Sequence, residues 1–398
     1  MARVLAIDTH PIQYKAPLYR RLQEEHGHEV SAYFASDLGT ARYADAEFGV
    51  EVAWNVDLLA GYRSFFAHRG QQGAAQSDIE MHKLRGRGLA KVLWQTRPQV
   101  ILLSGYTSLF VRDALSQLAL LPIPWVFRAE TTDHAVQRTA IKSLLRDNLL
   151  RGLYRRMSAL AYIGERSRRH YQRLGVPERK LFFAPYGVET SPFETSEADR
   201  ARLRHLCRAE LQVPDQRVVL LFSGKLSERK DPALLVQAVR SLPAVLRQRI
   251  TIVYLGAGEL SDQLVRLAAA EPRVDIRLIG FKSQGELSAY YHAADALVLG
   301  SRSGETWGLV VNEALHHGTP CIVSHLVGCA PDLIVPGQTG EVFEAGSAES
   351  LVRAIGRIWP RLGTRTTRER ARAHIAGYSL DAAASGLSQA IERSALRR

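Results

Sequence analysis

Two glutamates are the residues of this chain whose type and spacing most directly suggest chemistry. Glu305 and Glu313 bracket the segment Glu-Thr-Trp-Gly-Leu-Val-Val-Asn-Glu, directly after an apolar run at 296–300 that predicts a buried strand. From Leu309 onward apolar residues recur with helical spacing, and Thr306 is expected to cap that helix. Glu305 would then lie in a loop and Glu313 on the helix, about 12 Å away at the rise of an α-helix.

This arrangement suits a sugar nucleotide. One carboxylate could accept hydrogen bonds from sugar hydroxyls and the other from ribose hydroxyls. The helix start between them offers free N–H groups and a positive dipole end, which favour a diphosphate. The alternative is that Glu305 is an ordinary loop residue and that Glu313 pairs with a lysine or arginine.

A second strand-to-helix turn carries basic residues. The loop at 223–232 contains Lys225 and Lys230, which together with a helix start would favour an anion. Gly224 permits close approach of the backbone, and Gly256 after the next strand could pass under a base or ribose. The loop lacks the Walker pattern, so an ordinary connecting loop is the alternative.

Polar residues also follow two predicted strands in the first half of the chain. The first group is His10, Gln13 and Tyr14, and the second is Arg128, Glu130, Asp133 and His134. Because parallel strands end at one edge of a sheet, these groups could meet there as acid, base or hydrogen-bond acceptor. Each residue alone is better explained as a loop cap or an ion-pair partner, but their coincidence at one sheet edge favours a functional role.

Short apolar runs alternate with helical segments along the whole chain, which predicts α/β architecture with parallel sheets. The 398 residues exceed what one core usually holds, and a Pro- and Gly-containing segment at 185–193 predicts a linker between two doubly wound domains that face a cleft. The predicted strands are 4–7, 30–34, 100–103, 125–127 and 160–163, then 218–222, 250–255, 276–279, 296–299 and 321–323.

Composition narrows the protein class. No uncharged apolar run reaches the length of about 18 residues that a membrane span needs, and the first residues lack the pattern of a secretory signal. The three cysteines, Cys207, Cys321 and Cys329, are widely spaced, which fits a reducing compartment without structural zinc or disulfides. We therefore expect a cytoplasmic protein.

The formal net charge of +12 is unevenly distributed along the chain. The segment from Arg138 to Arg173 contains ten Lys or Arg and only two acidic residues. This excess of positive charge suits an anionic membrane surface or a phosphorylated substrate. We expect no nucleic-acid partner, because no nucleic-acid-binding motif accompanies the charge. The alternative is that these charges simply solvate helices; the 138–157 stretch is not cleanly amphipathic, since Arg138 and Leu149 would share a face.

Taken in order, the motifs resemble the family-4 retaining glycosyltransferases of the GT-B fold. The resemblance spans nearly the whole second half: Pro-Tyr-Gly-Val-Glu at 185–189, Gly224-Lys-Leu with Lys230, the paired glutamates, Gly318-Thr-Pro, Gly328, Pro331-Asp332-Leu and Gly-Gln-Thr-Gly at 337–340. His-Pro-Ile-Gln-Tyr at 10–14 resembles a bacterial subgroup linked to surface polysaccharides.

The resemblance implies two Rossmann-like domains, 1–188 for the acceptor and 189–379 for the donor, with a helix at about 380–398 packing back on the first. It implies retaining transfer of a sugar from a UDP- or GDP-linked donor to a hydroxyl acceptor, a lipid-linked or polysaccharide intermediate of cell-envelope glycan synthesis. No enzyme nucleophile and no metal would be required, and the chain also lacks Asp-x-Asp. The basic first domain would bring the protein to the inner face of the membrane.

The resemblance also implies residue roles. Lys225 and Lys230 would neutralise the donor diphosphate, Glu305 would contact sugar hydroxyls and Glu313 the ribose. The other donor-site residues would be Gly224, Gly256, Trp307, Gly308 and Leu309, and the acceptor side would hold His10, Gln13, Tyr14 and Arg128. Glu130 and His134, together with Arg128, are rivals for the catalytic role in the loop after 125–127. Lysine at 225 replaces the family's usual arginine, a point charge in place of a planar fork.

Two other functions stay open from the sequence. The chain could be a catalytically silent nucleotide-sugar-binding partner of an assembly complex, although the intact acidic and basic residues argue against degeneration. It could also glycosylate a small-molecule natural product.

Overall fold

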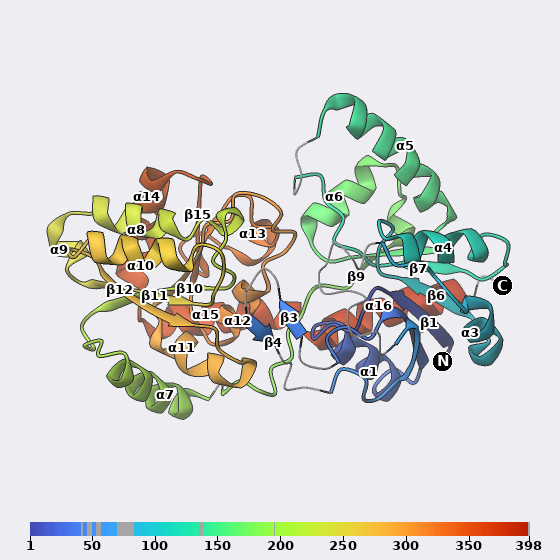
Figure 1. Cartoon of the computed structure of the whole chain (residues 1–398), viewed down its shortest axis with the longest axis horizontal. Helices are drawn as coiled ribbons and strands as arrows, with labels where there is room; N and C mark the ends of the chain where they lie inside the picture. The colour runs from blue at the N-terminus through green and yellow to red at the C-terminus, as the bar shows by residue number, and fades with distance from the viewer. Residues whose placement is uncertain are drawn as a thin grey trace.

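The computed structural model of the chain describes residues 1–40, 43–45, 50–52, 57–69, 83–134, 138–194 and 196–396. Two parallel sheets form two α/β domains that lie side by side (Figure 1). The first sheet has seven strands in the order β5-β2-β1-β6-β7-β8-β9, and the second has six in the order β12-β11-β10-β13-β14-β15. The predicted α/β fold with two doubly wound sheets is confirmed.

The strands of the first sheet are β1 (Arg3–Asp8), β2 (Glu29–Ser36), β5 (Arg63–His68), β6 (Val100–Leu103), β7 (Trp125–Phe127), β8 (Ala159–Tyr162) and β9 (Leu181–Phe183). Those of the second are β10 (Val218–Ser223), β11 (Ile250–Leu255), β12 (Asp275–Gly280), β13 (Ala296–Leu299), β14 (Cys321–Ser324) and β15 (Gly340–Phe343). A separate antiparallel pair joins β3 (Tyr43–Asp45) to β4 (Val50–Val52).

Helices cover both faces of the first sheet. One face packs against α3 (Leu89–Thr96), α4 (Leu109–Leu118), α5 (Ala140–Arg156) and α6 (Glu165–Arg173). The other packs against α1 (Ala16–Glu24) and α16 (Leu380–Ala395). Helix α16 thus returns from the second half of the chain to the first sheet, so that the two termini lie in the same domain (Figure 1).

Glycines permit this return. A Cβ on Gly386 would lie 1.7 Å from the carbonyl oxygen of Phe183, so α16 can approach β9 this closely only with glycine there. A Cβ on Gly187, in the linker, would lie 2.4 Å from the backbone nitrogen of Leu380. The predicted linker segment therefore crosses the start of α16 at a backbone-to-backbone contact.

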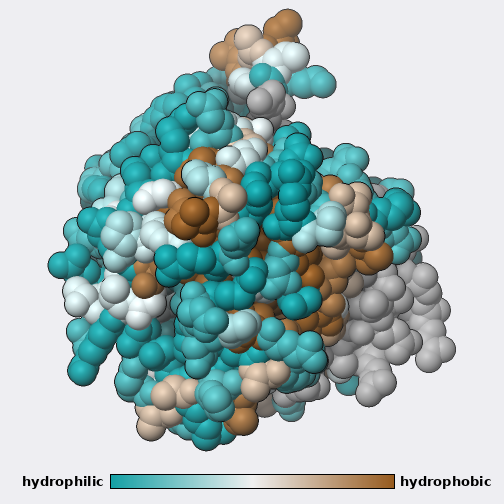
Figure 2. Space-filling view, turned by 90° about the vertical axis from the view of Figure 1, so that its left-hand side faces the viewer, coloured by the Kyte–Doolittle hydropathy of each residue, from teal (hydrophilic) through white to brown (hydrophobic). Residues whose placement is uncertain are grey.

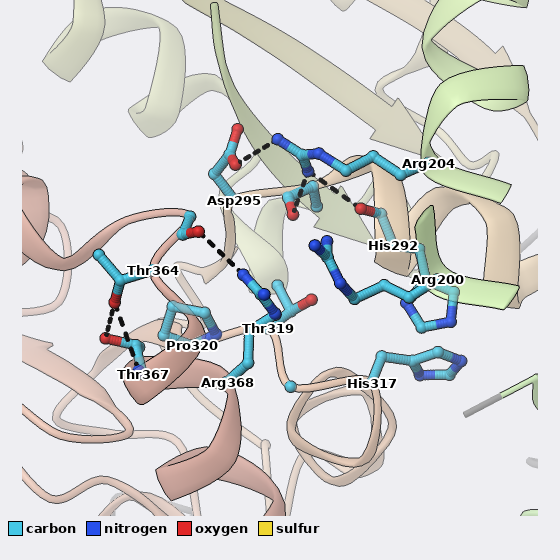
Figure 3. Close-up of a pocket in the computed structure, with 13 residues that line it drawn as sticks. Arg200, Arg204, His292, Asp295, His317, Thr319, Pro320, Thr364, Thr367 and Arg368 are labelled. Atoms are coloured by element: carbon cyan, nitrogen blue, oxygen red, sulfur yellow. Dashed lines mark hydrogen bonds and ion pairs between the residues drawn. The ribbon is translucent and has the colours of Figure 1, made fainter. Parts of the chain in front are cut away.

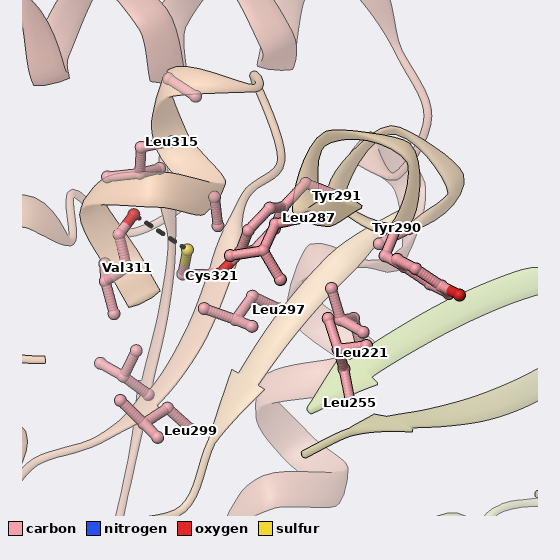
Figure 4. Close-up of a cluster of buried hydrophobic side chains, with 14 of the residues drawn as sticks. Leu221, Leu255, Leu287, Tyr290, Tyr291, Leu297, Leu299, Val311, Leu315 and Cys321 are labelled. Atoms are coloured by element: carbon pink, nitrogen blue, oxygen red, sulfur yellow. Dashed lines mark hydrogen bonds between the residues drawn. The ribbon is translucent and has the colours of Figure 1, made fainter. Parts of the chain in front are cut away.

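The second sheet is also covered on both faces. One face carries α7 (Glu197–Glu210), α11 (Leu287–Ala293), α12 (Leu309–His316), α13 (Ala330–Leu333) and α15 (Arg365–Ile375). The other carries α8 (Ala233–Ser241), α10 (Ser261–Ala270) and α14 (Ala348–Ile358), with the short α9 (Ala244–Arg247) beside them. Figure 4 shows the first of these cores, in which Leu221, Leu297 and Leu299 of the sheet meet Val311 and Leu315 of α12.

Within the described ranges, no helix has both the length and the apolar character needed to cross a bilayer. The same part of the chain contains no group of three or more His, Cys, Asp or Glu side chains placed to hold a metal ion. All three cysteines are buried free thiols.

Candidate active site

An ion pair joins the loops that follow β10 and β13, two neighbouring strands of the second sheet. Lys230 Nζ lies 3.0 Å from Glu305 Oε2, and both side chains are nearly buried. Arg229 lies 3.5 Å from the same oxygen, and Ser301 donates a hydrogen bond to it at 3.0 Å. The carboxyl edge of this sheet therefore gathers two cations around one carboxylate.

The charges around Glu305 decide its protonation state. Burial by itself raises the pKa of the carboxyl group. The charges of Lys230 and Arg229 and the hydrogen bonds to the carboxylate outweigh burial, so the pKa of Glu305 lies below its ordinary value. Glu305 is therefore ionised at neutral pH and can accept hydrogen bonds from hydroxyl groups.

Glu313 lies one helical turn into α12 and is held by two side chains from α11 and the turn before it. Tyr291 donates a hydrogen bond to Oε2 at 2.6 Å, and Gln284 donates one to Oε1 at 3.2 Å. Burial raises the pKa of Glu313, and these hydrogen bonds offset only part of that effect. The two predicted carboxylates thus differ: Glu305 lies among cations, whereas Glu313 lies among neutral hydrogen-bond donors.

Helix α12 begins between the two glutamates, but the prediction that Thr306 caps it is wrong. Gly308 occupies the N-cap position with φ of 104°, and no side chain caps the helix. Thr306 instead donates its hydroxyl to Glu130 Oε2 of the first domain. In the first turn the Val311 N–H donates to the backbone oxygen of Gly308 at 2.9 Å, and the N–H groups of Leu309 and Val310 precede it at the helix end that favours an anion.

Trp307 packs at the junction of the two domains. Its indole is 3% exposed and donates a hydrogen bond to Asn312 Oδ1 at 2.8 Å. Asn312 in turn donates to the backbone oxygen of Tyr186 in the linker at 3.0 Å. A Cβ on Gly164 of the first domain would lie 2.5 Å from the indole ring. The geometry gives Trp307 a role in joining the domains.

The two glycines predicted for the donor site touch each other. A Cβ on Gly256 would lie 2.0 Å from the carbonyl oxygen of Gly224, so the loops after β10 and β11 stack backbone on backbone. Gly224 has φ of 133°, and a Cβ there would lie 3.3 Å from Lys230 Nζ. Lys225, which follows it, is half-buried in the same loop. Gly256 is therefore explained by loop packing, and Gly224 lies directly beside the basic group.

On the first domain, Glu130 forms part of a hollow of about 300 Å³ that also reaches Thr306. Tyr186 donates a hydrogen bond to Glu130 Oε1, so the linker and the second domain both hold this carboxylate. The hollow is lined by Lys15, Ser104, Gly105, Tyr106, Thr107, Arg128, Ala129, Glu130, Thr131, Thr132, Arg138, Arg146, Tyr186 and Thr306. Its hydroxyls and charged groups suit a polar ligand.

Arg128 is buried and holds the linker. It donates to the backbone oxygens of Ala184 at 3.3 Å and Pro185 at 2.9 Å, and its guanidinium lies 4.8 Å from the centre of the Tyr186 ring. Tyr14 packs edge-on against the same ring, with centroids 5.4 Å apart. Arg128 and Tyr14, two residues predicted for the acceptor side, therefore contact the same side chain, that of Tyr186.

The structure separates His134 from Glu130. His134 lines a different hollow of about 550 Å³, together with Asp133, Arg138, Ser143, Arg146, Asp147 and Arg173. Burial, and then the charge of Arg166, lower the pKa of His134 to about 4, so its ring is neutral at neutral pH. His10 is half-buried with Nδ1 3.1 Å from the hydroxyl of Thr9, and Gln13 is half-buried nearby in the chain. Both residues reach the second domain: Glu130 accepts a hydrogen bond from Thr306, next to Glu305, whereas His134 has a backbone hydrogen bond with Leu326.

Sequence reasoning missed four residues at these sites: Arg229, Ser301, Tyr291 and Lys15. Arg229 directly precedes Lys230, so the run of basic residues was a readable signal. Lys15 ends the loop that follows the first predicted strand, directly after Tyr14, and pairs with Asp8 at 2.8 Å. Ser301 and Tyr291 carried no signal, because their roles depend on which loops and helices meet Glu305 and Glu313.

A third hollow lies at the opposite edge of the second sheet (Figure 3). It is lined by Asp295, which precedes β13, and by Thr319 and Pro320, which precede β14, so it opens at the amino ends of the strands. Its arginines are paired: Arg204 with Asp295 at 2.8 Å, and Arg368 with Glu197 at 3.0 Å. These pairs attach α7 and α15 to the domain, away from the predicted site.

Two family models match the chain. The one described as "Glycosyl transferase 4-like domain" matches residues 13–187, and "Glycosyl transferases group 1" matches residues 204–361. Among curated relatives, the chain is 31% identical over 212 residues to D-inositol 3-phosphate glycosyltransferase of Salinispora arenicola, covering 50% of this chain and 47% of the relative. The protein of that name from Pseudarthrobacter chlorophenolicus is 32% identical over 225 residues, covering 54% and 50%. The chain spans about half the length of the curated relatives it matches.

Solved structures share the fold over the whole chain. Sucrose-phosphate synthase of Thermosynechococcus elongatus has a TM-score of 0.69 at 18% identity, covering 97% of this chain and 98% of that one. Anabaena HepE, solved in complex with UDP and glucose, has a TM-score of 0.68 at 15% identity, covering 98% and 100%. These similarities confirm the GT-B fold. The two family models fall on the two sheets in turn, so each half of the chain is similar to glycosyltransferases.

Proposed function

We propose that this protein transfers a sugar from a nucleoside diphosphate sugar to a hydroxyl acceptor with retention at C1. The observation that carries the proposal is the meeting of Lys230, Arg229 and Glu305 next to the start of α12. Thr306, the residue after Glu305, reaches Glu130 in the hollow of the first domain. A donor at the cations and an acceptor in the hollow would therefore lie on either side of residues 305 and 306.

The charge distribution supports the chemistry. As the bond from C1 to the diphosphate oxygen breaks, positive charge develops at C1 and negative charge on the leaving diphosphate. Lys230 and Arg229, with Lys225 in the same loop and the N–H groups at the start of α12, can stabilise the leaving group without a metal ion. Glu305 accepts hydrogen bonds from the sugar hydroxyls, and Glu313 accepts them from the ribose. The acceptor oxygen bonds to C1 on the face that the diphosphate leaves, and its proton passes to the departing oxygen.

The acceptor is proposed from the hollow and the charge around it. Arg138 and Arg146 border the hollow and suit an anionic group, while Thr131 and Thr132 suit sugar hydroxyls. A lipid-linked phosphate sugar or a polysaccharide intermediate of cell-envelope synthesis combines both kinds of group. The relatives' acceptor, an inositol phosphate by their name, has the same combination. We place the reaction on the cytoplasmic side of the membrane, with a UDP- or GDP-linked donor.

Thermal stabilisation by a panel of nucleoside diphosphates and their sugars, with and without magnesium, tests the donor site. We expect one nucleotide class to raise the melting temperature without magnesium, and Glu313→Ala to abolish the shift. Donor turnover, measured as nucleoside diphosphate release, should then fall in Glu305→Ala while nucleotide binding persists. Stabilisation without release of nucleoside diphosphate under any acceptor would support the silent binding partner instead. Stabilisation by no member of the panel would contradict the donor site.

A further inference from the structure

The solvent-facing side of α5 is apolar. Ile141, Leu144, Leu145 and Leu149 are 74%, 60%, 66% and 65% exposed. Their spacing of three and four residues places them on one face of the helix. In the described part of the chain, no other helix exposes more than one large apolar side chain. A contiguous exposed apolar row of this kind marks a contact surface.

The exposed apolar row lies on a different side of α5 from the residues that pack into the core. Leu150 and Tyr154, on the opposite side, are 0% and 2% exposed within the core of the first domain. Asp147 accepts a hydrogen bond from Arg173 of α6 at 3.0 Å. The helix is therefore fixed to the domain by one side while a second apolar side faces outward. Its end stands above the rest of the molecule in Figure 2, where hydrophobic side chains gather at the tip.

The charged side chains that α5 exposes near this apolar row are all positive. Lys142, Arg155 and Arg156 are exposed on α5, and Arg151 is half-exposed. The acidic residue of the helix, Asp147, is buried against Arg173. An apolar row flanked by cations matches a bilayer with anionic headgroups, because leucines enter the acyl boundary while lysine and arginine remain at the phosphates.

The same helix borders the site. Arg146 lines both the hollow that contains Glu130 and the hollow that contains His134, and Ser143 lines the second. Arg138, just before the helix, lines both hollows as well. A surface that received the outer side of α5 would therefore lie beside the basic rim of the acceptor hollow.

We propose that Ile141, Leu144, Leu145 and Leu149 insert into an anionic lipid leaflet and hold the basic rim of the acceptor hollow at the level of the lipid phosphates. The docking itself requires only the exposed surface of α5. The second part, that docking presents a lipid-linked acceptor to the hollow, rests on the proposed function.

Co-sedimentation of the full chain with phosphatidylcholine vesicles, with and without phosphatidylglycerol, tests the docking. We expect binding that needs phosphatidylglycerol and weakens as salt rises. Leu145→Ser with Leu149→Ser should weaken it roughly tenfold, because each exposed leucine adds apolar area to the insertion. The matched control is Leu206→Ser with Val265→Ser, two residues that are each 55% exposed on helices of the second domain. This control should bind vesicles as the unaltered protein does.

Wild-type protein that stays in solution with anionic vesicles would overturn the proposal, as would equal binding by the α5 double variant. Loss of a dimer in the α5 variant, with no vesicle binding by either protein, would assign the row to a second copy and also overturn it. Nucleotide-induced thermal shifts, measured without vesicles, should be the same in all variants. A failure of docking is therefore distinguishable from a failure of the donor site.

Discussion

Lys230 Nζ and Glu305 Oε2 lie 3.0 Å apart, although 74 positions of sequence separate the two residues. The parallel pairing of β10 with β13 brings their loops together at one sheet edge. Removing either partner leaves the other as a nearly buried charge without its main counterion. The ion pair therefore sets the charge balance at this sheet edge and also supplies the groups proposed for catalysis.

Lys230→Ala and Glu305→Ala should each reduce donor turnover roughly tenfold or more, because each removes charge aimed at the reacting sugar phosphate. Release of nucleoside diphosphate, with circular dichroism to confirm folding, measures this effect. Glu228→Gln is a suitable control, since Glu228 is exposed in the same short helical turn. Turnover near that of the control in either alanine variant would contradict the site.

Tyr291→Phe should weaken nucleotide binding roughly fivefold to tenfold, since one hydrogen bond contributes about 1 kcal/mol. The hydroxyl of Tyr291 lowers the pKa of Glu313 against the effect of burial, so its loss raises that pKa and leaves a poorer acceptor for ribose hydroxyls. Calorimetric titration with the stabilising nucleotide measures the change. Tyr290→Phe, on the neighbouring residue, should bind normally, and an equal loss there would point to a general effect of α11.

Asn312→Ala should destabilise the protein by about 2–3 kcal/mol, because it leaves the indole N–H of Trp307 and the backbone oxygen of Tyr186 buried without partners. Urea unfolding followed by tryptophan fluorescence measures the difference. Asn148→Ala on the exposed face of α5 should change stability little. A small effect at Asn312 would mean that water replaces both hydrogen bonds.

His317 makes the fold sensitive to acid. Its Nδ1 donates to the backbone oxygen of Glu313 at 2.7 Å, so Nε2 accepts from the hydroxyl of Ser288 at 2.8 Å and the ring is neutral. Burial lowers the pKa of His317 to about 3 in the folded protein. The unfolded chain takes up the proton first, near pH 6.5, so folded stability falls by about 1.4 kcal/mol per unit as pH drops below that value.

Urea midpoints at pH 7.5 and 5 should therefore differ less in His317→Asn than in the unaltered protein. The asparagine can donate to Glu313 but does not titrate in this window. His292 and His316, whose pKa values burial also lowers to about 4, remain in both proteins and cancel in the comparison. An unchanged pH dependence would show that His317 is not the titrating group.

The central strands and the edge strand β12 were predictable from sequence, and the other three edge strands were not. Runs such as 100–103 and 296–299 are buried on both faces, so they are continuously apolar and their bounds agree with β6 and β13. The unpredicted β5, β9 and β15 lie at edges of their sheets. β5 illustrates the reason: its residues are half-buried or exposed, so its apolar pattern is too weak to distinguish it from a loop.

Individual residues of the candidate site were predictable where their type stands out within a loop. Glu305 and Lys230 stand out by residue type, and the structure brings them into contact. Thr306 was assigned to a cap because local spacing favoured that role, whereas its partner Glu130 belongs to the other domain. Contacts between domains depend on how two sheets are oriented, which local sequence patterns do not encode.

The hydrogen bond from Thr306 to Glu130 connects the two halves of the proposed site directly. Glu130 borders the hollow on the first domain, and Thr306 adjoins the carboxylate on the second. Any ligand that strengthens or breaks this bond from one side changes the affinity of the other side. Reciprocity requires that the second ligand alter the affinity of the first by the same factor. Under the proposed function, donor and acceptor would therefore influence each other's binding through a contact that includes this threonine hydroxyl.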